Sequence, residues 1–261
     1  MSKASPGKRF GELVAILEKL RSPEGCPWDR EQTFQSLRPY LLEETYEILE
    51  TIDEQKYPQL REELGDLLMH IVFQAQMARE QGLFDMADVI ADISAKLVRR
   101  HPHVFGEVKA LSARQVEREW EKIKLDDKEK TVLGGVPGSL PALLRAFRVQ
   151  EKAAGVGFDW EQVDSVFDKI TEEVEELKHA RQSGDQAKIE EEFGDLLFSL
   201  VNLSRFWKVS PEDALRRTVE KFIRRFNYVE KTLKEQGKDV RHSTLEEMDK
   251  LWDEAKAKGI K

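Results

Sequence analysis

The sequence predicts an all-α protein made of two tandem copies of one helical bundle unit. Three observations lead to this fold class. Glu, Lys, Leu, Arg, Ala and Gln dominate the composition and β-branched runs are short, so helix is favoured and we predict no strand. Helix-capping signals recur along the chain. Acidic and basic motifs occur twice, in the same order and at nearly constant spacing.

The capping signals give the order of the elements. A Ser, Thr or Asp before a first turn that holds Pro or acids is typical of a helix start, and Gly is typical of a helix end. The starts include Pro39, Pro58, Ser210 and Thr244, and the ends include Gly82, Gly184 and Gly237. We predict helices over residues 9–21, 38–54, 58–80, 86–100, 112–127, 140–153, 163–182, 185–207, 211–236 and 244–257.

The internal repeat is clearest in its acidic motifs. Residues 43–47 (EETYE) recur 129 residues later as 172–176 (EEVEE), and residues 62–68 (EELGDLL) recur at the same offset as 191–197 (EEFGDLL). Between these motifs, the residues from 48 to 61 do not match their counterparts. A merely solvated helix face has no reason to keep its acids while its surroundings change. Further matches pair residues 25–32 with 155–162 and residues 96–100 with 221–225.

The repeat predicts the domain organisation. Each copy has about 115 residues, a size typical of one domain. We expect an N-terminal helical domain at 1–126, a linker at 127–139 and a C-terminal helical domain at 140–261, which is the favoured catalytic copy. The linker lies in a segment that is charged and then rich in Gly and Pro, as is common between domains.

Composition excludes several classes of protein. The chain has 261 residues, 35% charged and 40% hydrophobic, and a net charge of −8. We therefore expect no stable nucleic-acid binding. No run approaches the roughly 18 apolar residues of a membrane span, and the N-terminus lacks a signal-peptide stretch, so we expect a cytoplasmic protein without membrane contact. Its single cysteine, Cys26, excludes an intrachain disulfide and a cysteine-based metal cluster.

The acidic motifs predict a site for a divalent cation in each copy. Acids at i and i+3 share one helix face, and a short turn between two such helices makes them antiparallel neighbours. Four carboxylates then converge beside an apolar stripe, where unpaired charges are costly and hard oxygen ligands suit Mg2+ or Mn2+. The second copy supplies Glu173, Glu176, Glu192 and Asp195, and the first copy supplies Glu44, Glu47, Glu63 and Asp66.

Two other interpretations of these acids remain open. A single EExxE motif is often just the charged face of a soluble helix. A di-iron carboxylate bundle is the rival metal site, but it needs Glu-x-x-His on two helices. Only Glu176 and His179 have that spacing, and we interpret His179 as a surface residue.

Basic residues complete the pattern of a polyphosphate site. Lys221, Arg224 and Arg225 share one helix face, and Lys96, Arg99 and Arg100 match them in the first copy. Arginine and lysine side chains suit phosphate oxygens. Lys169 and Lys188 stand before the acidic motifs of the second copy only, where they favour phosphate. Trp252 either stacks on a base or fills a core.

Together, these motifs resemble those of the all-α nucleoside triphosphate pyrophosphohydrolases. The resemblance spans residues 9 to 257 and rests on the paired acidic motifs, residues 25–29 (GCPWD), residues 98–105 (VRRHPHVF) and residues 221–226 (KFIRRF). It implies an α-helical homodimer that converts NTP or dNTP and water to NMP or dNMP and diphosphate, with Mg2+. It also implies metal ligands at Glu173, Glu176, Glu192 and Asp195, and substrate contacts from Lys169, Lys188, Lys221, Arg224, Arg225 and Trp252.

We expect water to attack the α-phosphorus, with Glu172 as the residue that orients or deprotonates it. Lys221 and Arg225 would stabilise the leaving diphosphate. A different hypothesis is a helical scaffold or nucleotide sensor whose acids bind metal only for stability. Such a protein would bind NTP, including ATP, and release it intact.

Overall fold

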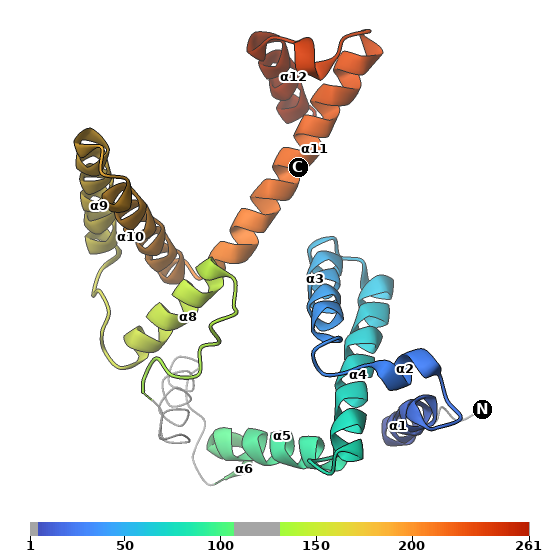
Figure 1. Ribbon diagram of the computed structural model, residues 1–261. Coiled ribbons are helices and arrows are strands. Elements are labelled where there is room, and N and C mark those ends of the chain that lie inside the picture. The colour runs from blue at the N-terminus through green and yellow to red at the C-terminus, as the bar shows by residue number, and fades with distance from the viewer. Residues whose placement is uncertain (1–4, 107–130, 261) are drawn as a thin grey trace. The chain divides into compact units, whose positions relative to one another are not determined.

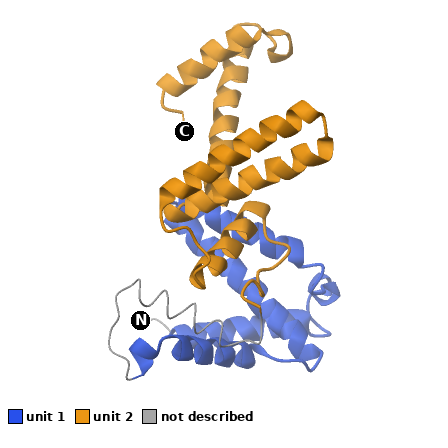
Figure 2. Ribbon diagram, turned by 90° about the vertical axis from the view of Figure 1, so that its left-hand side faces the viewer, with its two compact units in different colours: residues 1–110 blue, residues 111–261 orange. Residues whose placement is uncertain are grey.

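The computed structural model describes residues 5–106 and 131–260 of the chain. The chain divides into two compact units, Met1–Ala110 and Leu111–Lys261, which Figure 2 colours separately. The described part of the chain is helical and holds no strand. The all-α prediction is therefore confirmed. The helix expected at 112–127 and the first residues of the expected linker, 127–130, lie outside the described residues.

Unit 1 is organised around a helical hairpin. Helices α3 (Arg38–Asp53) and α4 (Tyr57–Glu80) are joined by a short turn and pack side by side (Figure 1). Helix α1 (Pro6–Arg21) packs on α4, and the short α2 (Pro27–Glu31) contacts α1. Helix α5 (Met86–Arg100) contacts α4 and leads into α6 (Pro102–Phe105).

Unit 2 contains a second hairpin of the same kind. Helices α9 (Val163–Ser183) and α10 (Gln186–Phe206) pack together over most of their length (Figure 1). Helix α8 (Ala142–Gly155) contacts α10 and α11 (Pro211–Glu235). The far end of α11 packs against η1 (Val240–His242) and α12 (Leu245–Ala257).

Local capping explains why the helix boundaries agree closely with the predicted ones. The Thr244 hydroxyl and the Glu247 carboxylate form a capping box at the start of α12. The Ser210 hydroxyl accepts a hydrogen bond from the backbone N–H of Asp213. Gly184 ends α9 with φ of 71°, a left-handed conformation that glycine adopts without strain. The short helices α2 and α6 were not predicted, because one or two turns carry no clear periodicity.

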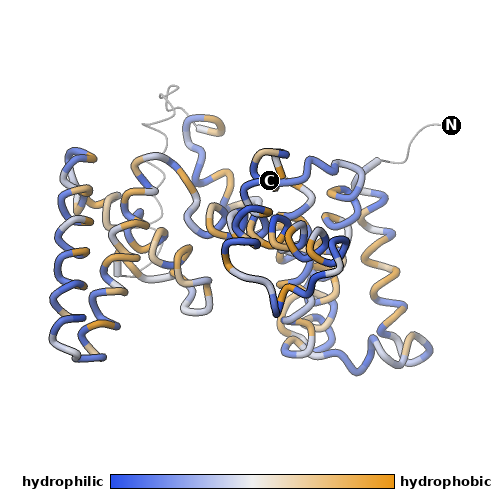
Figure 3. The backbone as a smooth tube through the Cα atoms, turned by 90° about the horizontal axis from the view of Figure 1, so that it is seen from above, coloured by the Kyte–Doolittle hydropathy of each residue, from blue (hydrophilic) through white to orange (hydrophobic). Residues whose placement is uncertain are grey.

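The helices carry mixed polarity along their length. Figure 3 shows hydrophilic and hydrophobic residues alternating along the tubes. None of the helices in residues 5–106 and 131–260 is long and apolar enough to cross a membrane.

The core of unit 1 lies where α1 meets α4. Leu17, Leu37 and Phe73 are each 2% exposed, and Met77 packs with them. Phe73 and Met77 lie four residues apart on α4, so they share the helix face that α1 covers.

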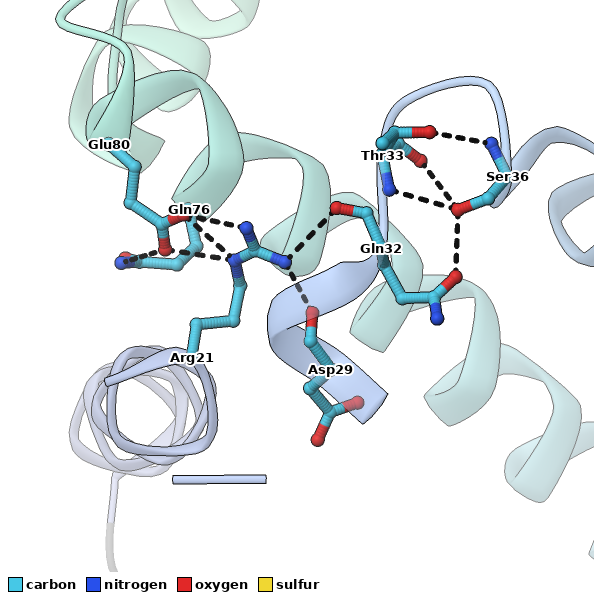
Figure 4. A network of polar contacts seen from close by, with 7 residues as sticks. All are labelled: Arg21, Asp29, Gln32, Thr33, Ser36, Gln76 and Glu80. Carbon is cyan, nitrogen blue, oxygen red and sulfur yellow. Dashed lines mark hydrogen bonds and ion pairs between the residues drawn. The ribbon is translucent and has the colours of Figure 1, made fainter. Parts of the chain in front are cut away.

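Arg21 ties α1 to α2 and α4 (Figure 4). Its guanidinium donates two hydrogen bonds to the Glu80 carboxylate, at 2.9 and 2.7 Å, and another to the carbonyl of Asp29. The same guanidinium lies 5.2 Å from the centroid of the Phe73 ring. The hydrogen bonds from Arg21 hold the pKa of Glu80 below its ordinary value of 4.5.

We expect Arg21→Ala to lower the free energy of unfolding of unit 1 by about 2 kcal/mol, the order of a charge-assisted hydrogen bond. Because the pKa of Glu80 is depressed in the folded chain, its contribution is complete above pH 4.5 and is lost as the pH falls through the lower folded value. Urea unfolding measured at several pH values tests this. Arg9→Ala, which removes an exposed pair with Glu12 on the same helix, is the control and should change little.

Candidate functional site

The α9–α10 hairpin gathers the acids of the second copy. Helix α9 carries Glu172, Glu173 and Glu176, and α10 carries Glu192 and Asp195. Ligand oxygens of Glu173, Glu176 and Glu192 all lie within 4.8 Å of one another. Three of the four predicted carboxylates therefore converge from two helices. Asp195 is not among these three, and the role of all four as metal ligands stays a prediction.

Glu173 is the buried member of this group. It is 3% exposed, and its Oε2 has no hydrogen-bond partner among the described residues. A buried carboxylate oxygen without a partner is costly, and a cation would offset the cost. Oxygen donors gathered in this way fit a hard divalent cation such as Mg2+.

The acids repel one another. The pKa of Glu192 is raised above its ordinary value of 4.5, first by desolvation and then by the charges of Glu176, Glu191, Asp195 and Glu173. The charged form of the Glu192 carboxylate is therefore less favourable here than in a free glutamate.

Lys169 relieves part of this repulsion. Its Nζ lies 2.8 Å from Glu173 Oε1 and 3.0 Å from Glu172 Oε1, one turn along α9. These hydrogen bonds, the one to Glu173 first, raise the pKa of Lys169 well above 10.5, so the ammonium stays charged. Lys169 thus stands beside the acids, as the sequence predicted.

A cavity of about 750 Å³ adjoins the acids. Lys169, Glu173 and Asp195 line it, whereas Glu172, Glu176 and Glu192 do not. The size falls in the range of small-molecule sites. The rest of the wall comes from the segment before α8, from α8, from the loop before α9 and from α10. It consists of Leu133, Val149, Gln150, Ala153, Gly157, Phe158, Asp159, Trp160, Phe198, Ser199, Asn202 and Arg205.

Polar groups in this wall are held in place by one another. The buried Gln150 donates from Nε2 to the carbonyl of Phe198 at 2.8 Å, which leaves its Oε1 without a partner among the described residues. Arg205 pairs with Asp159 and donates to Asn202 Oδ1 at 2.9 Å. These wall residues are not predictable from the motifs of the sequence. The only signal was the recurrence of residues 25–32 at 155–162, which contain Phe158 and Trp160.

The predicted basic residues of α11 do not line this cavity. Figure 1 shows α11 leaving the hairpin near α8 and running away from it. Arg225 Nε donates to the Ile260 carbonyl at 2.9 Å, and its guanidinium lies 5.8 Å from the centroid of the Trp252 ring. Trp252 packs against the small core between α11 and α12. Lys221, Arg224 and Lys188 are also absent from the cavity wall.

The first copy repeats the acidic group with different neighbours. Oxygens of Glu44, Glu63 and Asp66 lie within 4.8 Å of one another, and all three residues are half-buried. Burial, followed by repulsion from Asp66 and Glu47, raises the pKa of Glu44. Burial and then repulsion from Glu47 and Asp66 raise the pKa of Glu63. Glu47 therefore lies close to the group although it is not one of these three.

The neighbours of this first group were not predicted. Tyr40 stands where the second copy has Lys169, and its ring stacks on that of His70 with centroids 6.5 Å apart. The corresponding basic residues, Lys96, Arg99 and Arg100, lie on α5. His70 follows Asp66 by four residues, a spacing that could have placed it on the acidic face of α4.

Comparisons with known proteins agree with the repeat. Residues 32–105 and 161–230 match the family model of the MazG nucleotide pyrophosphohydrolase domain. These ranges hold both acidic groups and the basic set of α11, but they end before Trp252. The chain therefore belongs to the MazG nucleotide pyrophosphohydrolase family and carries its domain twice.

Individual relatives span nearly the whole chain. A Thermotoga maritima protein named nucleoside triphosphate pyrophosphohydrolase/pyrophosphatase MazG is 50% identical over 253 residues, 96% of each chain. An Escherichia coli K12 protein named nucleoside triphosphate pyrophosphohydrolase is 48% identical over 259 residues, 97% of this chain and 98% of the relative. The Bacillus subtilis protein YabN is 47% identical over 95% of this chain, which spans only 51% of YabN.

We expect Glu192→Gln to raise the melting temperature of the metal-free chain at pH 7 by roughly 1–3 °C. The substitution removes a carboxylate whose charged form is disfavoured in the fold. Because the folded pKa is raised, the repulsion is absent well below pH 4.5 and grows as the pH rises through the folded value, so the gain should shrink in acid. Calorimetry in EDTA measures it. Glu190→Gln on the same helix is the control. An equal rise in its melting temperature would contradict the view that the charge of Glu192 is unfavourable in the fold.

Proposed function

We propose that this chain hydrolyses nucleoside triphosphates and deoxynucleoside triphosphates to the monophosphate and diphosphate at the acids of unit 2. The proposal rests on one observation. Glu173, Lys169 and Asp195 line a cavity whose volume suits a nucleotide. The names of the Thermotoga and Escherichia relatives support the same activity.

The metal in this proposal is Mg2+, with Mn2+ as the alternative. Glu173, Glu176, Glu192 and Asp195 would hold it, and the unpartnered oxygen of Glu173 fits that role. When bound, the ion supplies positive charge that neutralises the phosphates and polarises the bond to be broken.

Residues of the chain carry the proton transfer. Water attacks the α-phosphorus and forms a new P–O bond, while the bond from that phosphorus to the bridging oxygen breaks. Diphosphate leaves with the electron pair, and the carboxylate of Glu172 accepts the proton of the attacking water. Lys169, which holds Glu172 at 3.0 Å, orients that carboxylate and adds positive charge beside the phosphates.

The nucleoside part of the substrate occupies the cavity in this proposal. Trp160 and Phe198 offer aromatic faces for a base, and the free Oε1 of Gln150 offers a hydrogen-bond acceptor. Phosphates bound beside Glu173, Asp195 and Lys169 would leave the base to contact the aromatic residues of the same wall.

A homodimer is part of the proposal. Helix α11 exposes the apolar residues Val219, Phe222 and Ile223, and α10 exposes Phe193 and Leu197. A second copy of the chain that covers such faces would bury apolar surface. It would also be able to bring the basic set of an α11, namely Lys221, Arg224 and Arg225, to phosphates held by the acids, with Lys188 and Trp252 as further substrate contacts.

We expect Mg2+-dependent release of NMP and diphosphate from a panel of NTPs and dNTPs, with no turnover in EDTA. In ¹⁸O-labelled water the label should enter the monophosphate, because water attacks the α-phosphorus. Anion-exchange chromatography and mass spectrometry measure both.

Glu173→Gln and Asp195→Asn should each lower kcat about a hundredfold or more. Glu44→Gln and Asp66→Asn are the matched controls in unit 1 and should keep full activity. Release of NDP and phosphate would contradict the cleavage position, and intact NTP would favour a sensor.

We expect Trp160→Ala to raise KM for NTP about tenfold, the order of one base–aromatic stacking contact, with a smaller effect on kcat. Steady-state kinetics with ATP and dCTP measure the change. Trp28→Ala is the control, since Trp28 belongs to the corresponding segment of unit 1. An unchanged KM for Trp160→Ala would contradict the placement of the base.

A further inference from the structure

The amide of Gln150, in the wall of the unit 2 cavity, is held in a single orientation. Its Nε2, on α8, donates to the carbonyl oxygen of Phe198 on α10 at 2.8 Å. A carbonyl oxygen can only accept, so the amide cannot be turned over and its Oε1 is left to accept from another group. Gln150 is 7% exposed, and this Oε1 has no hydrogen-bond partner among the described residues.

The amide of Asn202, in the same wall, is held with the opposite polarity. Its Oδ1 accepts hydrogen bonds from Nε and Nη2 of Arg205, at 3.2 and 2.9 Å. A guanidinium can only donate, so Oδ1 stays on the side of Arg205 and Nδ2 is the group left to donate to a ligand. Arg205 is itself fixed, because it pairs with Asp159 on the loop before α9.

The two amides meet at one turn of α10. Gln150 and Asn202 both line the cavity, together with Trp160. The carbonyl of Phe198 that holds Gln150 belongs to the turn that carries Asn202, since residues four apart lie one above the other on a helix. The wall therefore offers a fixed acceptor from α8 and a fixed donor from the adjoining turn of α10.

A donor and an acceptor held in this way match the edge of a nucleobase. The buried acceptor of Gln150 costs free energy unless a bound molecule supplies an N–H or O–H. The Watson–Crick edge of every ordinary base carries an N–H beside a ring nitrogen or carbonyl oxygen, which in adenine are the 6-amino group and N1. Pyrimidines have no counterpart of the N7 edge of purines, so the Watson–Crick edge is the one that all nucleotides share.

We propose that Gln150 and Asn202 bind the Watson–Crick edge of the base and select against nucleotides that lack an N–H donor there. This rests on the function proposed above, since it names the part of the substrate that the same cavity recognises. Gln150 Oε1 accepts from the amino group or ring N–H of the base. Asn202 Nδ2 donates to the adjoining ring nitrogen or carbonyl oxygen. The specificity then lies in the polarity of two oriented amides.

Adenine nucleotides that differ by one group test this on the wild-type chain. Purine riboside triphosphate lacks the 6-amino group, and we expect its kcat/KM to be about tenfold or more below that of ATP, because Gln150 Oε1 stays unpaired. 1-Deaza-ATP lacks the N1 acceptor and should be a similarly poor substrate. 7-Deaza-ATP, which is changed on the opposite edge, is the control and should react about as fast as ATP. Equal kcat/KM for ATP and purine riboside triphosphate would overturn the proposal.

Substitution of each amide should remove its own part of the discrimination. In Gln150→Leu, the ratio of kcat/KM for ATP to that for purine riboside triphosphate should fall close to one. In Asn202→Leu, the ratio for 1-deaza-ATP should do so. Each ratio is taken on one preparation, so it does not depend on the fraction of chain that is folded. Gln182→Leu, at an exposed position on α9, is the control and should keep both ratios. A tenfold preference for ATP that persists in Gln150→Leu would overturn the proposal.

Binding measurements separate base recognition from hydrolysis. Calorimetric titration of ATP and purine riboside triphosphate into Glu172→Gln, which lacks the proposed proton acceptor, compares the two affinities without relying on turnover. Tighter binding of ATP to a chain that does not hydrolyse NTP would support base recognition and contradict the proposed hydrolysis. Turnover of both nucleotides with equal affinity would overturn base recognition alone.

Discussion

Repulsion between carboxylates gathered by a helical hairpin is the constraint on which both units depend. In each unit, two packed helices bring three acids to within 4.8 Å. Desolvation first, and then the charges of the neighbouring carboxylates, raise the pKa values of Glu63 and Glu192, so their charged forms are disfavoured there. A fold that retains such a group needs compensating charge. Lys169 provides part of it in unit 2, and a cation is the natural source of the rest.

The two hairpins differ most in what borders their acids. Unit 2 places a lysine and a cavity there, whereas unit 1 places a tyrosine, a histidine and a packed core. Tyr40 and Phe73 each replace a polar residue of unit 2 with an aromatic one. Phe73 is buried in the core of unit 1, whereas Asn202 lines the cavity of unit 2. Two copies of one scaffold can thus carry different chemistry while their acids and their helices stay alike.

Capping and periodicity predicted the long helices closely because both are properties of short segments. Asp185 and Thr244, for example, make their capping hydrogen bonds within three residues. Spacing along two adjacent helices also predicted the convergence of the acids. The position of the basic residues relative to the acids could not be predicted in this way, because their spacing along α11 does not give the direction in which α11 leaves the hairpin. Trp252 packs against the α11–α12 core, and its role as a substrate contact stays a prediction.

The all-α class, the duplication, the boundaries of the long helices and the pairing of acids across each hairpin could all be predicted from the sequence. Each of these follows from contacts within a turn or between helices joined by a few residues. Tertiary structure alone decided that Gln150 and Asn202 share a wall with Trp160, and that His70 faces Glu44 across the hairpin of unit 1. Such neighbours come from different helices and loops. Their approach depends on how side chains pack, which no local pattern encodes.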